Sequence, residues 1–290
     1  MTAKLWRDWD QEGLDKQLNL RARWPNFQKF FQAWAKGSQL VRERLPRKLD
    51  VAYGPTAGQK LDFFPAAGVG PAPLLVFIHG GYWQALDKSD FSYLAPPFVE
   101  DGIAFVSLNY DLAPGVSLTT MVQQIERAVA WLAQHAAELG CDASRMVLAG
   151  HSAGGHLTTI AMIREAIAAA DGGPKPLISA GCSVSGVYDL VPVRRSYHQQ
   201  MVRFTERETQ ALSPLRHQPA TLAPLVVAVG DQETEEFLLQ QEALVAQWRN
   251  LGLPLEVQML AGDNHFEAVD ALAERDHALF AAVKRLCRPT

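Results

Sequence analysis

The stretch VLAGHSAGGHL, residues 147–157, describes an apolar strand that ends abruptly at a corner and continues as a helix. Within it, Gly150, Ser152 and Gly154 fit the pattern G-x-S-x-G. Such a corner strains the backbone of the serine, and side chains two residues to either side would collide with the turn. It also presents the hydroxyl at the edge of a sheet, beside the free N–H groups that begin the helix. We therefore interpret Ser152 as a nucleophile, rather than as a helix cap whose glycines serve only packing.

The composition is ordinary for a soluble globular protein, with 48% hydrophobic and 20% charged residues among 290. A net charge of −4 provides no basic field to attract nucleic acid or an anionic membrane surface. The start of the chain is charged throughout, unlike a signal peptide, and no apolar run is long enough to span a membrane. Cys141, Cys182 and Cys287 are far apart and odd in number, which argues against a disulfide framework and against a metal site. We expect a cytoplasmic protein.

From residue 49 onward, short runs rich in Val, Ile, Leu and Phe alternate with helix-length segments. This alternation predicts an α/β fold in which a mostly parallel, eight-stranded sheet has helices on both faces. The run PLLVFIHG, residues 73–80, is apolar at consecutive positions, as in a strand buried on both faces. The first two runs are close together and predict an antiparallel hairpin at one edge of the sheet. The expected strands are 49–53, 60–64, 74–79, 104–110, 146–149, 178–185, 225–229 and 255–260.

The remaining segments complete a single domain over residues 1–290, because no change of composition marks a second one. Helical spacing of apolar residues predicts helices over 118–139, 153–170, 235–250 and 267–286. Residues 1–48 have an amphipathic, helical pattern that is broken at Trp24-Pro25. The longest stretch without a clear strand, 187–223, is a candidate for a small lid over a site.

A serine nucleophile needs a base to take its proton and a third group to orient that base. Of the eight histidines, His265 alone follows the final strand on a loop before a helix, at the sheet edge where Ser152 is expected. The acid should follow the preceding strand, and Asp231 and Glu233 both do so. The resulting order of serine, acid and histidine is that of the α/β-hydrolases.

The stretch HGGYW, residues 79–83, follows the third expected strand and supplies consecutive glycines. Glycines allow a backbone to approach a substrate with its N–H groups turned inward, where they can stabilise an oxyanion. We assign the oxyanion donors to the backbone N–H groups of Gly81, Tyr82 and Ala153, and we expect His79 to brace the loop. The stretch resembles the HGGG-type motif, with Tyr82 in place of the third glycine. The alternative is a flexible turn that ends a strand.

Several of these stretches together resemble the arylformamidases, also called kynurenine formamidases. The resemblance rests on HGGYWQ, GHSAGGHL, VSGVYDL, VGDQETEEF and the pair Ser213-Pro214, and it extends over roughly residues 49–287. It implies an α/β-hydrolase close to the esterases of the hormone-sensitive-lipase type. The family reaction is the hydrolysis of N-formyl-L-kynurenine to kynurenine and formate. Animal members carry an aspartate three residues after the glycine of the acid loop, where this chain has Glu233. The resemblance therefore favours Glu233 as the acid and leaves Asp231 as a rival.

The leading hypothesis is a serine hydrolase without cofactor or metal that cleaves small esters or aryl formamides through an acyl-enzyme. The bulk of Tyr82 predicts a short acyl group, and Trp83, Tyr188 and Phe266 are candidates for an aromatic wall around the substrate, although each could instead belong to the core. One alternative is a general short-chain carboxylesterase with no role in kynurenine metabolism. Another is a non-catalytic binding protein on a hydrolase scaffold. A homodimer is also compatible with the sequence.

Overall fold

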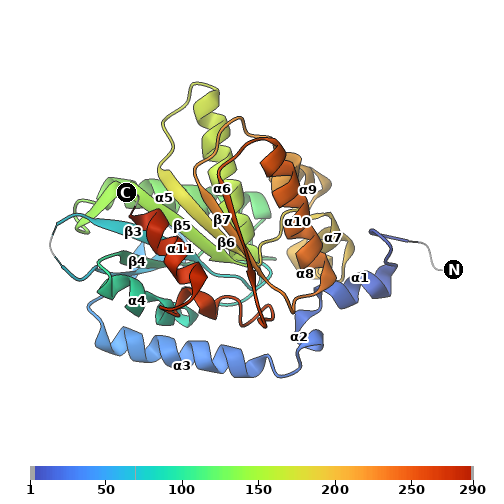
Figure 1. Cartoon of the computed structure of the whole chain (residues 1–290), viewed down its shortest axis with the longest axis horizontal. Coiled ribbons are helices and arrows are strands. Elements are labelled where there is room, and N and C mark those ends of the chain that lie inside the picture. The colour runs from blue at the N-terminus through green and yellow to red at the C-terminus, as the bar shows by residue number, and fades with distance from the viewer. Residues whose placement is uncertain (1–3, 69, 289–290) are drawn as a thin grey trace.

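A computed structural model describes residues 4–68 and 70–288, and its centre is a single sheet (Figure 1). The strands are β1 (Lys48–Ala52), β2 (Lys60–Phe64), β3 (Ala72–Ile78), β4 (Ala104–Leu108), β5 (Cys141–His151), β6 (Ile178–Val184), β7 (Leu225–Gly230) and β8 (Leu255–Leu260). They are ordered β1-β2-β4-β3-β5-β6-β7-β8. The pairs β1–β2 and β2–β4 are antiparallel, and the other pairs are parallel. The predicted eight-stranded, mostly parallel sheet with a hairpin at one edge is confirmed.

Helices cover both faces of this sheet. They are α1 (Gln11–Leu18), α2 (Leu20–Arg23), α3 (Gln28–Arg44), α4 (Ala95–Glu100), α5 (Leu118–His135), α6 (Ala153–Ala170), α7 (Val191–Arg195), α8 (Gln199–Val202), α9 (Glu206–Leu212), α10 (Glu235–Asn250) and α11 (Ala278–Cys287). Short 3₁₀ helices lie at Lys88–Asp90, Ser92–Leu94, Pro214–Arg216 and Asp270–Leu272. Helices α4 and α11 share one face, where the rings of Phe98 and Phe280 lie 4.8 Å apart, while α5 and α6 pack together on the other face.

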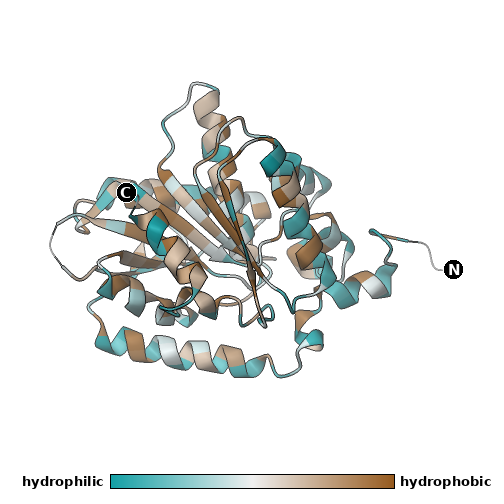
Figure 2. Ribbon diagram, viewed as in Figure 1, coloured by the Kyte–Doolittle hydropathy of each residue, from teal (hydrophilic) through white to brown (hydrophobic). Residues whose placement is uncertain are grey.

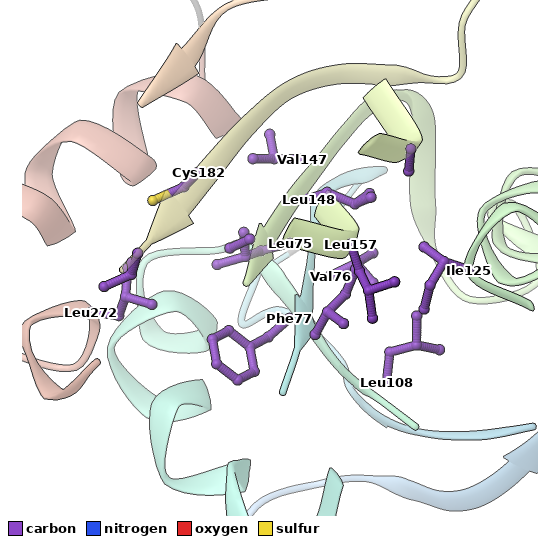
Figure 3. Close-up of a cluster of buried hydrophobic side chains, with 14 of the residues drawn as sticks. Leu75, Val76, Phe77, Leu108, Ile125, Val147, Leu148, Leu157, Cys182 and Leu272 are labelled. Atoms are coloured by element: carbon purple, nitrogen blue, oxygen red, sulfur yellow. The ribbon is translucent and has the colours of Figure 1, made fainter. Parts of the chain in front are cut away.

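The core forms around β3, because every residue of this strand is buried. Figure 3 shows Val76 beside Leu157 of α6, whereas Phe77, the next residue of the strand, points to the opposite face. Such alternation buries both faces, as expected for a parallel strand between two helical layers. In Figure 2 the central strands are accordingly coloured mainly as hydrophobic. No helix in residues 4–68 and 70–288 has both the length and the apolarity needed to cross a membrane.

The N-terminal segment lies outside the sheet, and polar side chains attach it to the helices that cover the sheet (Figure 1). Arg7 pairs with the buried Glu236 at 2.9 Å, and Trp34 of α3 donates a hydrogen bond to Asp270 at 2.9 Å. The helical prediction over 1–48 holds from Gln11 onward, while residues 1–3 lie outside the described residues.

One helix prediction is wrong in its first half. The segment 267–286 begins with turns and the 3₁₀ helix Asp270–Leu272, and an α-helix forms only from Ala278. Local polar contacts explain the difference, because the side chain of Asn264 accepts from the amide of Phe266 and that of His277 accepts from the amide of Leu279. The apolar residues in the first half of this segment are therefore buried within turns, and their spacing does not indicate a helix there. The candidate lid 187–223 contains α7, α8 and α9 and no strand.

Candidate active site

Ser152 occupies the corner between β5 and α6 with φ 57° and ψ −119°, a conformation that strains any residue with a side chain. The backbone explains the two glycines of the motif. A Cβ at Gly150 would collide with the carbonyl oxygen of Gly154, and a Cβ at Gly154 would collide with that of Ile78. The corner therefore requires the sequence that it has, and it holds the serine at the carboxyl end of the sheet.

His265 and Glu233 meet at the same edge of the sheet. The Nδ1 atom of His265 lies 2.6 Å from Oε2 of Glu233, and both side chains are buried. Oε1 of Glu233 accepts hydrogen bonds from the hydroxyl of Ser185 and, at 3.2 Å, from the amide of Gly230. The carboxylate is thus held on both oxygens. Because Nδ1 donates to Glu233, the Nε2 atom of His265 is the nitrogen left to accept a proton.

Asp231, the rival acid, lies elsewhere. It is exposed at the start of the same loop and accepts a hydrogen bond from the amide of Gly262 at 2.8 Å. This contact ties the loops after β7 and β8 together without reaching His265. The structure therefore brings Glu233, and not Asp231, to the histidine.

His151, the residue before the serine, also supports His265. Its Nε2 atom donates to the backbone oxygen of His265 at 2.8 Å, and the two ring centroids lie 4.7 Å apart. Burial lowers the pKa of His151 well below its usual range, so the ring is neutral. Sequence reasoning missed this residue, although its place inside the G-x-S-x-G motif could have drawn attention to it.

The loop after β3 approaches the serine from the other side. Gly81 and Tyr82 both have positive φ, 96° and 50°, and no acceptor for their amides or for that of Ala153 is found among the described residues. Both ring nitrogens of His79 are engaged, Nδ1 with the Gly80 oxygen and Nε2 with Asn109 Oδ1, each at 2.9 Å. His79 therefore fixes the loop, while the amides of the three expected oxyanion donors stay free.

A cavity of about 450 Å³ opens at this point. Ser152 and His265 both line it, together with Gly81, Tyr82 and His198. The other lining residues are Asn19, Leu20, Arg21, Phe31, Trp34, Gln84, Ala85, Leu86, His151, Tyr197 and Phe266. Five of these come from the N-terminal helical segment, which contains no recognisable motif. The candidate lid contributes only Tyr197 and His198.

The three aromatic residues expected around the substrate have different positions. Trp83 is fully buried against the rings of His156 and Phe204, and Tyr188 is fully buried with its hydroxyl 2.9 Å from that of Ser183. Neither lines the cavity, and both belong to the core. We therefore correct the expectation for these two residues: Tyr188 lies within the buried run 181–190, and the ring of Trp83 turns into the core although its neighbours Tyr82 and Gln84 line the cavity.

Phe266 does line the cavity, and its ring also packs against aromatic rings of α3. It stacks on Phe30 with 5.6 Å between ring centroids and meets Phe31 edge-on at 5.8 Å. Because it directly follows His265, this aromatic packing ties the histidine loop to α3. Among the described residues, no group of three or more His, Cys, Asp or Glu side chains could hold a metal ion.

A family model described as BD-FAE matches residues 61–234, which is more than half of the chain. The chain belongs to the BD-FAE family. The match to this family includes the loop after β3, the corner at Ser152 and the acid loop with Glu233.

Relatives of this BD-FAE protein extend the likeness over nearly the whole chain. It is 28% identical to a kynurenine formamidase of Salmo salar, over 94% of this chain and 95% of the relative. A kynurenine formamidase of Danio rerio is 30% identical over 85% of this chain and 84% of its own length. The crystal structure of a candidate thioesterase from Silicibacter sp. TM1040 has 31% identity and a TM-score of 0.80, covering 92% of this chain and 97% of that one. The protein is an α/β-hydrolase, of the type to which esterases and formamidases belong.

Proposed function

We propose that the protein is a serine hydrolase that cleaves aryl formamides and small aryl esters with Ser152, His265 and Glu233. The observation that carries this proposal is the 2.6 Å contact between His265 and Glu233 at a cavity that Ser152 also lines. The Ser152 hydroxyl has no hydrogen-bond partner among the described residues, so it is free to turn toward the histidine when substrate binds.

Each step then has a residue to perform it. His265 Nε2 takes the hydroxyl proton as Ser152 Oγ attacks the formyl or acyl carbon, and Glu233 stabilises the imidazolium that forms. The free amides of Gly81, Tyr82 and Ala153 stabilise the negative oxygen of the tetrahedral intermediate. His265 passes its proton to the leaving amine or alcohol. Water then attacks the acyl-enzyme with His265 as base, releasing the acid and restoring the serine.

The named activities of the relatives support the formamide part of the proposal, because two of them are kynurenine formamidases. Three of the aromatic residues that line the cavity, Phe31, Trp34 and Phe266, fit a flat leaving group. We also assign the protein to the cytoplasm, since Cys141, Cys182 and Cys287 are all free and buried. The homodimer stays a prediction.

Labelling with a fluorophosphonate tests the nucleophile directly. Wild-type protein should be labelled at Ser152 and should hydrolyse formanilide and p-nitrophenyl acetate, and Ser152→Ala should do neither. The matched control is Ser144→Ala, at an exposed serine near the other end of β5, which keeps Ser152 and should still be labelled. Labelling of folded Ser152→Ala to the wild-type extent would overturn the proposal.

A further inference from the structure

Arg21 provides a cation at the rim of the cavity. Apart from histidines, it is the only one of the described lining residues with an ionisable side chain that is charged at neutral pH. Arg21 makes no ion pair with any residue that the structure describes. A cation without a partner beside an aromatic cavity is suited to an anion on the substrate.

Aromatic rings fix the position of this guanidinium. Its carbon lies 5.3 Å from the ring centroid of Phe27 and 5.7 Å from that of Phe31. Because Phe31 itself lines the cavity, the exposed guanidinium lies at the cavity opening. Stacking over rings occupies the face of a guanidinium and leaves its in-plane N–H groups free for a carboxylate.

Two neutral donors stand beside Arg21 in the cavity lining. The side-chain oxygen of Asn19 accepts from the amide of Ala22 at 3.1 Å, which leaves its amide nitrogen without a partner among the described residues. Tyr197 lines the same rim, and burial raises the pKa of its hydroxyl to about 12, so it remains a donor at neutral pH. The rim thus offers several donors, and the nearby anion Asp15 does not line the cavity.

Among the described residues that line the cavity, none carries a carboxylate. Asp15 lies beside the rim without lining the cavity, and its Oδ1 accepts from Gln11 and from the amide of Tyr197 at 3.1 and 2.8 Å. An ammonium group on a substrate would therefore enter a cavity with a cation and no anion. This asymmetry disfavours an amino-acid zwitterion relative to a simple acid.

We propose that Arg21 forms a carboxylate-binding subsite and that the substrate is an aryl formamide or aryl ester bearing an acid but no ammonium group. This inference rests on the proposed serine hydrolase and specifies its substrate class. It differs from the amino-acid substrate implied by the names of the relatives.

Three ortho-formamidophenyl ketones on one scaffold test the charge preference. One ends in a carboxylate, one carries a methyl group in place of that carboxylate, and the third is N-formylkynurenine, which adds an ammonium group to the first. Wild-type kcat/KM should be about ten- to a hundredfold higher for the acid than for the methyl compound, as for a charged hydrogen-bonded contact. The preference should shrink as ionic strength rises, because the rim is open to solvent. Hydrolysis of N-formylkynurenine should be slower than that of the acid.

Arg21→Gln should lower the ratio of acid to methyl hydrolysis by about tenfold or more, and Arg21→Lys should retain part of it. The control is Arg23→Gln, two residues away, whose side chain lies over Trp24 and does not line the cavity. It should keep the wild-type ratio. An unchanged ratio in Arg21→Gln, or faster cleavage of N-formylkynurenine than of the acid, would overturn the inference. If the ratio is near one while p-nitrophenyl acetate is cleaved and Ser152 is labelled, only the subsite fails. Failure of labelling as well overturns the proposed function.

Discussion

Two regions build the active site in different ways. The loops after β3, β5, β7 and β8 carry the groups of the proposed mechanism, and each is fixed by backbone geometry or by a buried hydrogen bond. The N-terminal segment 11–44 supplies much of the cavity wall, and it is attached by aromatic packing and by isolated polar contacts. This difference predicts that the residues needed for catalysis and the residues that select the substrate lie in separate regions of the molecule. Changes in the strand-end loops should abolish turnover, whereas changes in the wall should redirect it.

The largest expected effect is that of Ser152→Ala. Removing the nucleophile should lower kcat by about 10⁴-fold or more, because only binding and the oxyanion donors would remain. The wall variant Phe31→Ala should instead act mainly through KM for aryl substrates. Steady-state kinetics on p-nitrophenyl acetate, with circular dichroism to verify folding, measure both. A comparable loss of kcat in the two variants would contradict the separation of the regions.

Glu233→Gln should have the next largest effect, with a loss of about 10⁴-fold in kcat, since an amide cannot stabilise the imidazolium of His265. Asp231→Asn is the matched control in the same loop. It keeps an oxygen that can accept from the amide of Gly262, and it should therefore change stability and kcat little. If Asp231→Asn proves to be the crippling change, the assignment of the acid is wrong by two residues.

The sequence predicted the strand-end loops better than the wall, for physical reasons. Gly150 is required by a collision within the turn and Gly154 by a collision with Ile78 of the neighbouring strand β3, and the three residues of the motif stand within five positions of one another. The meeting of His265 with an acid follows from parallel strands that end at one edge, although only the structure shows that Glu233 faces inward. The cavity wall that segment 11–44 provides depends on packing between residues far apart in the sequence, and no local sequence pattern indicates it.

The positions of Trp83 and Tyr188 also could not be predicted from the sequence. Both follow strands and lie in family-like stretches, yet their rings turn into the core while Tyr82 faces the cavity. Exposure of an aromatic ring depends on which neighbours fill the interior, and a short pattern does not contain that information. The helix predicted over 267–286 failed similarly, because side-chain contacts of Asn264 and His277 set its true beginning.

Tyr82 links the two regions and sets the third prediction. It lies in the oxyanion loop, donates from its hydroxyl to the Leu18 oxygen at 2.9 Å, and stacks on His198 at 3.7 Å. Because the ring is held in this way, it should limit the length of the acyl group. Each methylene that does not fit should cost about 1–3 kcal/mol of transition-state binding. We expect kcat/KM on p-nitrophenyl esters to fall from acetyl and butyryl to octanoyl, and Tyr82→Gly to flatten this profile. A wild-type optimum at octanoyl or longer would contradict the role of Tyr82.

The smallest expected effect concerns stability and the attachment of the wall. Asp270 follows the histidine loop and accepts hydrogen bonds on Oδ1 from Trp34 of α3 at 2.9 Å and from Tyr93 at 2.6 Å. Burial raises the pKa of this carboxyl to about 6, and the negative charges of Glu274 and Asp263 add to the shift. In the unfolded chain the value is about 3.9. The folded state therefore binds the proton more tightly, and the stability that it gains is complete below about pH 4 and is lost as pH rises through about 6.

Asp270→Asn isolates this contribution, because an amide oxygen can still accept from Trp34 and Tyr93 but cannot ionise. The free energy of unfolding of the wild type, relative to that of Asp270→Asn, should fall by up to about 2 kcal/mol between pH 4 and pH 7. Urea unfolding at several pH values measures the difference, with Asp276→Asn as a control on an exposed carboxyl of the same segment. Parallel curves for wild type and Asp270→Asn would show that the carboxyl ionises as freely in the folded protein as in the unfolded chain. In that case Trp34 and Tyr93 would be held by aromatic packing, and the attachment of the wall would be independent of pH.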